Sequence, residues 1–275
     1  MILKPRNGRI FKMKTDRIYV SVTSIHQHQR MLLQTLKSIK SQTLPPDQCF
    51  VYLSDEPYLL DIGFKDKNIS DNDLKNFINE NSNMFSVIWV KNTGPYRKLL
   101  NILHDKWDDN CAIITIDDDT VYHKDFIQDI ITDYNKHQCC IGNRCWELVF
   151  DNIQRITYRH LFPTHPVNLF NFHTGKGGVL YQPEWFHKTE EIVFDESLYT
   201  SLCKTNDDIW FNFLRIANNI PCANGKRRDY MTTDLSRGKG SEYALYKNYN
   251  SVDNANTKNI RATVNKLIDL GYLNT

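Results

Sequence analysis

A short apolar run, Ala112-Ile113-Ile114-Thr115-Ile116, leads directly into three aspartates, Asp117-Asp118-Asp119. The run is rich in β-branched residues, which is typical of a buried strand. Three adjacent carboxylates repel one another at neutral pH unless a cation neutralises them. Hard divalent cations take carboxylate oxygens as ligands, and α/β proteins bind ligands at the carboxyl ends of their strands. The stretch therefore indicates a metal site with a phosphorylated ligand; a solvated acidic turn is the simpler alternative.

Strand and helix patterns alternate on both sides of this stretch. Strands are predicted at residues 18–24, 49–53, 85–90 and 112–116, and helices at 29–39, 71–79, from 97 onward and at 124–135, with Ser70 as N-cap of the second helix. Four such units predict an α/β fold with a mostly parallel central sheet flanked by helices. The carboxyl ends of the strands then bring Ser24, Asp55, Lys98 and Asp117 toward one cleft.

The second half of the chain has a different pattern. Residues 146–150 and 153–158 flank Asp151-Asn152 and predict a hairpin, a small antiparallel β element. Helices are predicted at 206–218, with Asn206 as cap, and at 257–270. The polar stretch 231–256 between them suggests a mobile segment. No linker stands out, so residues 1–275 are interpreted as one domain with two halves, about 17–138 and about 139–275.

Composition narrows the class of protein. The 275 residues are 41% hydrophobic and 24% charged with a net charge of +2, so a dedicated nucleic-acid binder is not expected. No apolar run approaches the roughly 20 residues that span a bilayer, and the start, residues 1–6, lacks the apolar core of a signal peptide. The seven cysteines form no CxxC pair, which favours free thiols in the cytoplasm over a structural zinc site.

Several short motifs, taken in order, resemble the GT-A glycosyltransferases, in particular the inverting, DxD-containing family 2-like enzymes. The matching stretches cover about residues 17–218: Val22-Thr23-Ser24 with Arg30, Leu53-Ser54-Asp55, Asn92-Thr93-Gly94-Pro95-Tyr96-Arg97-Lys98, Ile116-Asp117-Asp118-Asp119-Thr120, Gly177-Gly178 and Asn206-Asp207-Asp208-Ile209-Trp210. The resemblance implies that residues 17–138 bind a nucleotide sugar and that the later half binds the acceptor.

The resemblance also assigns roles to particular residues. Those expected to bind a UDP-, GDP- or TDP-sugar donor are Thr23, Ser24, Arg30, Asp55, Lys98, Asp117 and Asp118. Asp117 and Asp119 match the outer positions of the DxD motif, which would hold Mn²⁺ or Mg²⁺ on the donor diphosphate. The histidine that often completes this metal shell is missing, because no histidine follows His187. The acceptor is expected to be a glycan, a lipid-linked sugar or a protein.

Inversion needs a base that takes the proton of the attacking hydroxyl. Asp208 aligns with that base, and Asp207 takes the place often held by Glu. Without the resemblance, both acids are better explained as first-turn residues favoured by the helix dipole, and the resemblance reverses that preference. On the acceptor side, Gly177 and Gly178 would let a sugar approach the backbone, and Trp185 and Trp210 would offer apolar faces. An ordinary turn and a buried core are the respective alternatives.

Three rival functions fit parts of the sequence. Asp117 and Asp119 also match the nucleophile and the acid/base of haloacid-dehalogenase-like phosphatases, although that signature normally follows the first strand of its fold. A nucleotidyltransferase shares the α/β nucleotide site. A non-catalytic relative that only binds sugar or protein would keep the fold without needing Asp208.

Overall fold

The computed structural model describes residues 17–152, 155–160, 166–225, 230–237 and 242–274. The start of the chain, on which the expectation about a signal peptide rests, lies outside these residues. Strand and helix alternate as predicted through the first half: β1 Arg17–Thr23, α1 Gln29–Lys40, β2 Gln48–Leu53, α2 Asn72–Glu80, β3 Phe85–Trp89, α3 Arg97–Asp105, β4 Cys111–Ile116 and α4 Phe126–His137.

The central sheet has seven strands in the order β11-β6-β10-β4-β1-β2-β3. β1, β2, β3 and β4 pair in parallel, as do β6 (Cys140–Gly142) and β11 (Cys222–Asn224). β10 (Val179–Tyr181) is inserted antiparallel between β4 and β6. The predicted mostly parallel α/β sheet is therefore confirmed, and its centre is the strand that precedes the aspartates.

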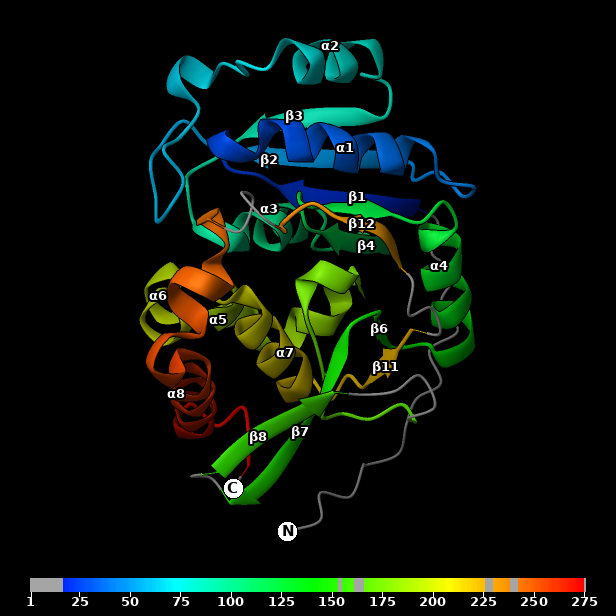
Figure 1. The fold of residues 1–275 in the computed structure, drawn as a ribbon. Helices are drawn as coiled ribbons and strands as arrows, with labels where there is room; N and C mark the ends of the chain where they lie inside the picture. Colours follow the sequence, from blue (N-terminus) through cyan, green and yellow to red (C-terminus); the bar gives the residue numbers. More distant parts are fainter. Residues whose placement is uncertain (1–16, 153–154, 161–165, 226–229, 238–241, 275) are drawn as a thin grey trace.

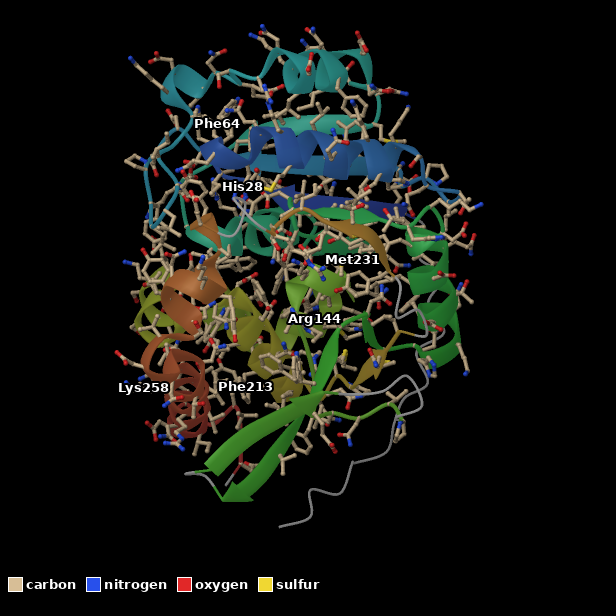
Figure 2. All side chains as sticks on the ribbon, in the orientation of Figure 1. His28, Phe64, Arg144, Phe213, Met231 and Lys258 are labelled. Carbon is tan, nitrogen blue, oxygen red and sulfur yellow. The ribbon has the colours of Figure 1, made fainter. Side chains whose placement is uncertain are left out.

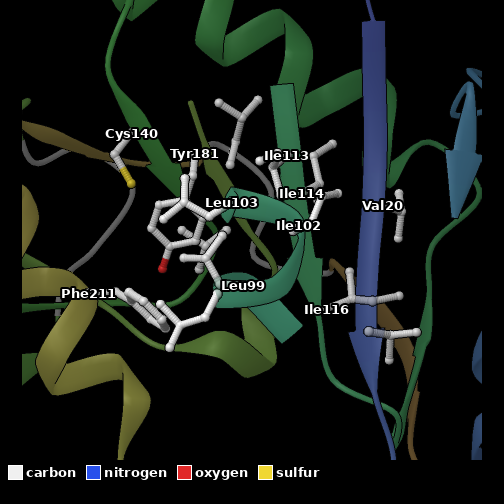
Figure 3. Packing of buried hydrophobic residues seen from close by; sticks show 14 of the residues in the cluster. Val20, Leu99, Ile102, Leu103, Ile113, Ile114, Ile116, Cys140, Tyr181 and Phe211 are labelled. Carbon is white, nitrogen blue, oxygen red and sulfur yellow. The ribbon is translucent and has the colours of Figure 1, made fainter. Parts of the chain in front are cut away.

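Helices cover both faces of this sheet. In Figure 1, α1 crosses in front of β1 and β2, and α3 lies behind them. Figure 3 shows Leu99, Ile102 and Leu103 of α3 beside Ile113 and Ile114 of β4. All five side chains are completely buried, and burying one aliphatic side chain of this size stabilises the fold by about 1.5–3 kcal/mol. This packing fixes the first turn of α3 next to the end of β4.

The second half adds small sheets and a helical layer. β7 (Cys145–Asn152) pairs with β8 (Arg155–His160) and β9 (Asn171–His173), and β12 (Met231–Asp234) pairs with β5 (Thr120–Tyr122). The helices of this half are α5 Glu190–Val193, α6 Glu196–Cys203, α7 Asp207–Ala217 and α8 Ala255–Asp269. The predicted antiparallel β element is thus confirmed, and α6, α7 and α8 pack together on one side (Figure 1).

Local details differ from the prediction at two places. Asp71, not Ser70, caps α2, because its carboxylate accepts the Leu74 N–H at 2.9 Å. Asp151 and Asn152 continue β7 instead of turning, since Asn152 pairs with Arg155 across a bulge. No helix of the described residues is long and apolar enough to cross a membrane.

Candidate active site

A cleft of about 860 Å³ opens at the carboxyl ends of β1 and β4 and reaches the start of α7. The sheet edge explains its position, because parallel strands leave their ends and the following loops on one side. Eight of the predicted site residues line it: Thr23, Ser24, Lys98, Asp117, Asp118, Asp119, Asp207 and Asp208. The cleft therefore joins acids that lie about ninety positions apart in the sequence.

The three aspartates after β4 point to different partners. Asp117 accepts from the Lys98 ammonium at 2.9 Å. Asp118 turns away, accepting from the Ser24 hydroxyl and lying 3.1 Å from Nδ1 of His28. Asp119 accepts only a 3.2 Å bond from Thr120 among the contacts described for its carboxylate. The different directions follow from the backbone, because Asp118 and Asp119 lie in a turn.

Asp119 lies close to two other carboxylates. Burial, followed by the neighbouring charges of Asp117 and Asp118, raises the pKa of Asp119 to about 7, although Lys176 acts in the opposite direction. No group of three or more His, Cys, Asp or Glu in the described parts of the chain is arranged to hold a metal ion. Asp117 and Asp119 nevertheless offer hard oxygen atoms that repel one another, which fits a divalent cation whose other ligands come from a diphosphate and water.

A second pair of acids opens α7. Asn206 caps this helix by accepting from the Ile209 N–H, which places Asp207 and Asp208 in the first turn. Asp207 is buried, whereas Asp208 is half-buried at the cleft and its Oδ1 accepts from the Gly175 N–H at 2.9 Å. Burial and the adjacent charge of Asp207 raise the pKa of Asp208 to about 7. Such a group can take up a proton near neutral pH.

Lys98 lies between the two groups of acids. Its Nζ is 2.9 Å from Oδ1 of Asp117 and 3.3 Å from Oδ2 of Asp207. Burial alone would lower the pKa of Lys98, but Asp117, Asp207 and Asp208 outweigh it and raise the pKa well above its ordinary value. The sequence predicts a phosphate partner for this lysine, whereas the structure shows carboxylate partners.

Sequence reasoning missed a buried ion pair on the side of the cleft that the first half of the chain forms. Asp61 accepts from the Arg97 guanidinium at 3.2 Å, from Asn92 and from two backbone N–H groups. Nη1 of Arg97 has no hydrogen-bond partner among the described residues, although the side chain is only 1% exposed. Arg97 belongs to the motif at residues 92–98 that resembles the glycosyltransferases. Asp61 matches no motif and lies eight positions after the end of β2, so nothing in the sequence pointed to it.

The second half contributes further cleft residues that the sequence did not single out. Arg144 and Trp146 flank the start of β7, and Lys176 reaches Asp234 at 2.7 Å. Residues 243–247 also line the cleft, where Tyr243 packs edge-on against His28. Figure 2 labels His28, which belongs to the first half of the chain, and Arg144, which belongs to the second. Both halves of the chain therefore form the cleft walls.

Two residues expected at the donor lie outside the cleft. The Arg30 side chain is 93% exposed and pairs with Asp71 at 3.5 Å. Asp55 is exposed at the end of β2, and Asp61 is the buried acid in this region. Helix and strand patterns locate an element, but they do not determine which of its side chains, or of the loop after it, faces the cleft.

The expected acceptor residues are packing residues instead. Gly178 has φ +76°, and a Cβ there would meet the Phe126 ring at 2.3 Å. A Cβ on Gly177 would lie 2.6 Å from the Arg144 backbone nitrogen. Trp185 is 5% exposed, and Trp210 is fully buried with its indole N–H donating to the Val193 carbonyl. None of these four residues lines the cleft.

No family model matches the chain, and no curated protein matches its sequence. Among solved structures, S. aureus TarS 1-349 in complex with UDP is similar at a TM-score of 0.51 and 15% identity, covering 76% of this chain and 58% of that one. The same TarS piece in complex with UDP-GlcNAc gives a TM-score of 0.47 at 12% identity, over 81% of this chain and 61% of that one.

A third similar structure is 4-diphosphocytidyl-2C-methyl-D-erythritol synthase from Anaerococcus prevotii, with a TM-score of 0.49 at 10% identity over 83% of this chain and 99% of that one. Only the first of these three scores is high enough to support an argument about the fold. With the seven-stranded sheet, it identifies the class: the chain has a GT-A-like α/β fold. The chain spans 58% of the length of that TarS structure, so activity and substrates are a matter of proposal.

Proposed function

We propose that this protein is an inverting glycosyltransferase that moves a sugar from a nucleoside-diphosphate donor to a hydroxyl group of a glycan, lipid-linked or protein acceptor. The observation that carries the proposal is the meeting of two groups of acids in one cleft. Asp117 and Asp119 follow the central strand, while Asp208 begins α7 and is poised to take a proton near neutral pH. Sugar transfer needs both kinds of group, one at the diphosphate and one at the attacking hydroxyl.

At the donor end, Asp117 and Asp119 would hold Mg²⁺ or Mn²⁺. When bound, such an ion supplies Lewis-acid stabilisation of the leaving diphosphate. The nucleoside would lie along Thr23 and Ser24, in the half formed by residues 17–138. The buried Arg97 supports this placement, because its Nη1 lacks an acceptor among the described residues and a carbonyl or phosphate oxygen would provide one.

At the acceptor end, Asp208 is the proposed base. Its carboxylate removes the proton of the acceptor hydroxyl while that oxygen bonds to the anomeric carbon. The bond from the anomeric carbon to the diphosphate oxygen breaks, and the electron pair leaves with the nucleoside diphosphate. Attack from the side opposite the leaving group inverts the anomeric centre. The acceptor would enter over residues of the second half such as Trp146 and Arg144, which replace the tryptophans expected from sequence.

The two rival enzymes are less well supported. In the phosphatase alternative, Asp117 is a free nucleophile at the end of a first strand. Here it follows β4, and its Oδ1 is held by Lys98. The similarity to the diphosphocytidyl-methylerythritol synthase, at a TM-score of 0.49, is too weak to support a nucleotidyltransferase.

The seven cysteines are all unpaired and buried, which agrees with action in the reducing cytoplasm.

A donor panel tests the proposal. UDP-, GDP- and TDP-sugars are incubated with Mn²⁺ or Mg²⁺, beginning with UDP because TarS was solved with it. We expect metal-dependent thermal stabilisation by at least one nucleoside diphosphate and release of that diphosphate from its sugar donor. Asp119→Ala should abolish both effects, and Asp73→Ala, an exposed acid of α2, should change neither. Phosphate release from a simple phosphomonoester, without any effect of nucleotides, would overturn the proposal.

A further inference from the structure

Lys98 is the one residue that touches both groups of acids among the contacts described for this cleft. Its ammonium lies within 3.3 Å of Asp117, which follows β4, and of Asp207, which begins α7. The Lys98 carbonyl also accepts a hydrogen bond from the Ser21 hydroxyl of β1. The side chain thus joins the turn after β4 to the first turn of α7.

The surroundings of Lys98 are shaped for a compact charge. A Cβ on Gly175 would lie 2.5 Å from Nζ of Lys98, 3.1 Å from Oδ1 of Asp117 and 3.3 Å from Oδ1 of Asp208. Glycine at this position therefore leaves the space that the ammonium fills, while its N–H holds Asp208. An ammonium is a point charge with three donors, whereas a guanidinium is a planar fork that needs more room.

Burial makes this arrangement rigid. The side chains of Lys98 and Asp207 are 9% and 8% exposed, and that of Asp117 is 30% exposed. A buried charge is tolerated only when it is paired, so the acids cannot separate from the ammonium without a large loss of stability. The distance between the donor-side acid and the start of α7 is consequently set by Lys98.

We propose that Lys98 is a positioning residue of the transfer site, whose ammonium fixes the donor-side acid Asp117 relative to Asp207 and thereby to the base Asp208. This inference rests on the proposed function. The sequence led us to expect that Lys98 binds the donor itself. In this proposal Lys98 acts through the carboxylates of Asp117 and Asp207 instead. We expect that changes at Lys98 slow transfer but leave the affinity for the nucleoside diphosphate nearly unchanged, because Asp117 and Asp119 both remain to hold the metal.

The test compares Lys98→Met, which keeps the length and removes the charge, with Gly175→Ala, which keeps the charge and displaces it. Lys91→Met is the matched control, because Lys91 is exposed and forms a surface pair with Glu196 at 2.8 Å. Turnover is measured as nucleoside diphosphate released by water from the best donor of the UDP, GDP and TDP panel, which requires no identified acceptor. Affinity is measured by calorimetry with that nucleoside diphosphate and Mn²⁺.

We expect both cleft variants to lose about 100-fold in turnover at saturating donor, since a misplacement of about 1 Å has this effect. Their affinity for the nucleoside diphosphate should stay within about threefold of the wild type, and the control should match it in both. A merely structural role would lower turnover only in proportion to the unfolded fraction, which circular dichroism reports. If Lys98→Met does not fold, Lys98→Arg decides the question by the same two measurements, because it keeps the charge but places it on a planar fork that needs more room.

Two results would overturn the inference while leaving the proposed function intact. One is a folded Lys98→Met variant with wild-type turnover. The other is a parallel loss of affinity and turnover, which would make Lys98 a donor contact. A wild-type protein that releases no diphosphate contradicts the proposed function instead. In that case a crystal structure decides about Lys98: we expect its ammonium in contact with both Asp117 and Asp207, at the 2.9 and 3.3 Å found here, and an ammonium elsewhere would overturn the inference.

Discussion

The backbone N–H of Gly175 donates a 2.9 Å hydrogen bond to Oδ1 of Asp208. Gly175 lies in a 3₁₀ turn, Gly175–Gly177, just before the antiparallel strand β10, and Asp208 lies in the first turn of α7. The bond fixes one carboxylate oxygen and leaves the other oxygen to act at the cleft. A carboxylate oriented by a backbone donor has little freedom to rotate, which is what a proton acceptor at a fixed distance requires.

Asp208→Asn removes the proposed base without changing the shape of the side chain. We expect transfer to fall by about 10²- to 10⁴-fold, the usual contribution of a general base. Donor binding should be unchanged, because the donor-side acids are intact. Steady-state kinetics with calorimetry for the nucleoside diphosphate checks both. Transfer at the wild-type rate in this variant would assign the base to Asp207 or point to a retaining mechanism.

The pH dependence of transfer follows from the same residue. Because burial and Asp207 raise the pKa of Asp208 to about 7, its carboxyl group is protonated and inactive as a base below that value. Turnover should therefore rise as the pH increases through about 7 and level off above it. A pH profile of kcat at saturating donor measures this midpoint. A profile that is already level at pH 5 would mean that a more acidic group, with an ordinary carboxyl pKa, removes the proton.

The Asp61–Arg97 pair should matter for stability much more than a surface pair does. Both side chains are at most 2% exposed. Asp61→Asn leaves the Arg97 charge buried and unpaired, which costs about 3–5 kcal/mol. Glu196→Gln breaks the exposed pair with Lys91, which water and salt screen, and should cost far less. Urea unfolding of the two variants gives the comparison, and equal losses would contradict it.

The sequence was sufficient to predict the four parallel strands of the first half and the sheet edge where the acids gather, but not β6, β10 and β11. Short apolar runs and amphipathic helical spacings are local properties, so β1 to β4 and the helices between them followed from the residues. The aspartates after β4 and those of α7 were found because each group lies directly at the end of such an element. The position of the cleft then followed from one further rule, that parallel strands end on the same side of a sheet.

Side-chain partners in the cleft could not be predicted in the same way. Lys98 pairs with Asp207 across 109 positions of sequence. Asp61 lies in a loop that has no periodic pattern and pairs with Arg97, which is 36 positions further along the chain, beyond α2 and β3. Trp185 and Trp210 are of the residue type that could present an apolar face to a sugar ring, but both are buried as core residues are. Such distinctions depend on contacts between distant segments, and a single sequence does not contain them.

Gly178 provides a last prediction, because it separates a packing role from a role in binding a sugar. Gly178 and Gly271 both have positive φ, +76° and +79°, which a side chain disfavours. Gly271 faces open space, so Gly271→Ala should cost only the backbone term of about 1–2 kcal/mol. Gly178→Ala adds a Cβ 2.3 Å from the Phe126 ring and should cost a further 1–3 kcal/mol, roughly, from overpacking. Denaturant unfolding measures both variants. If Gly178→Ala were as stable as Gly271→Ala but bound acceptor poorly, the glycine would belong to the acceptor site that its sequence context suggested.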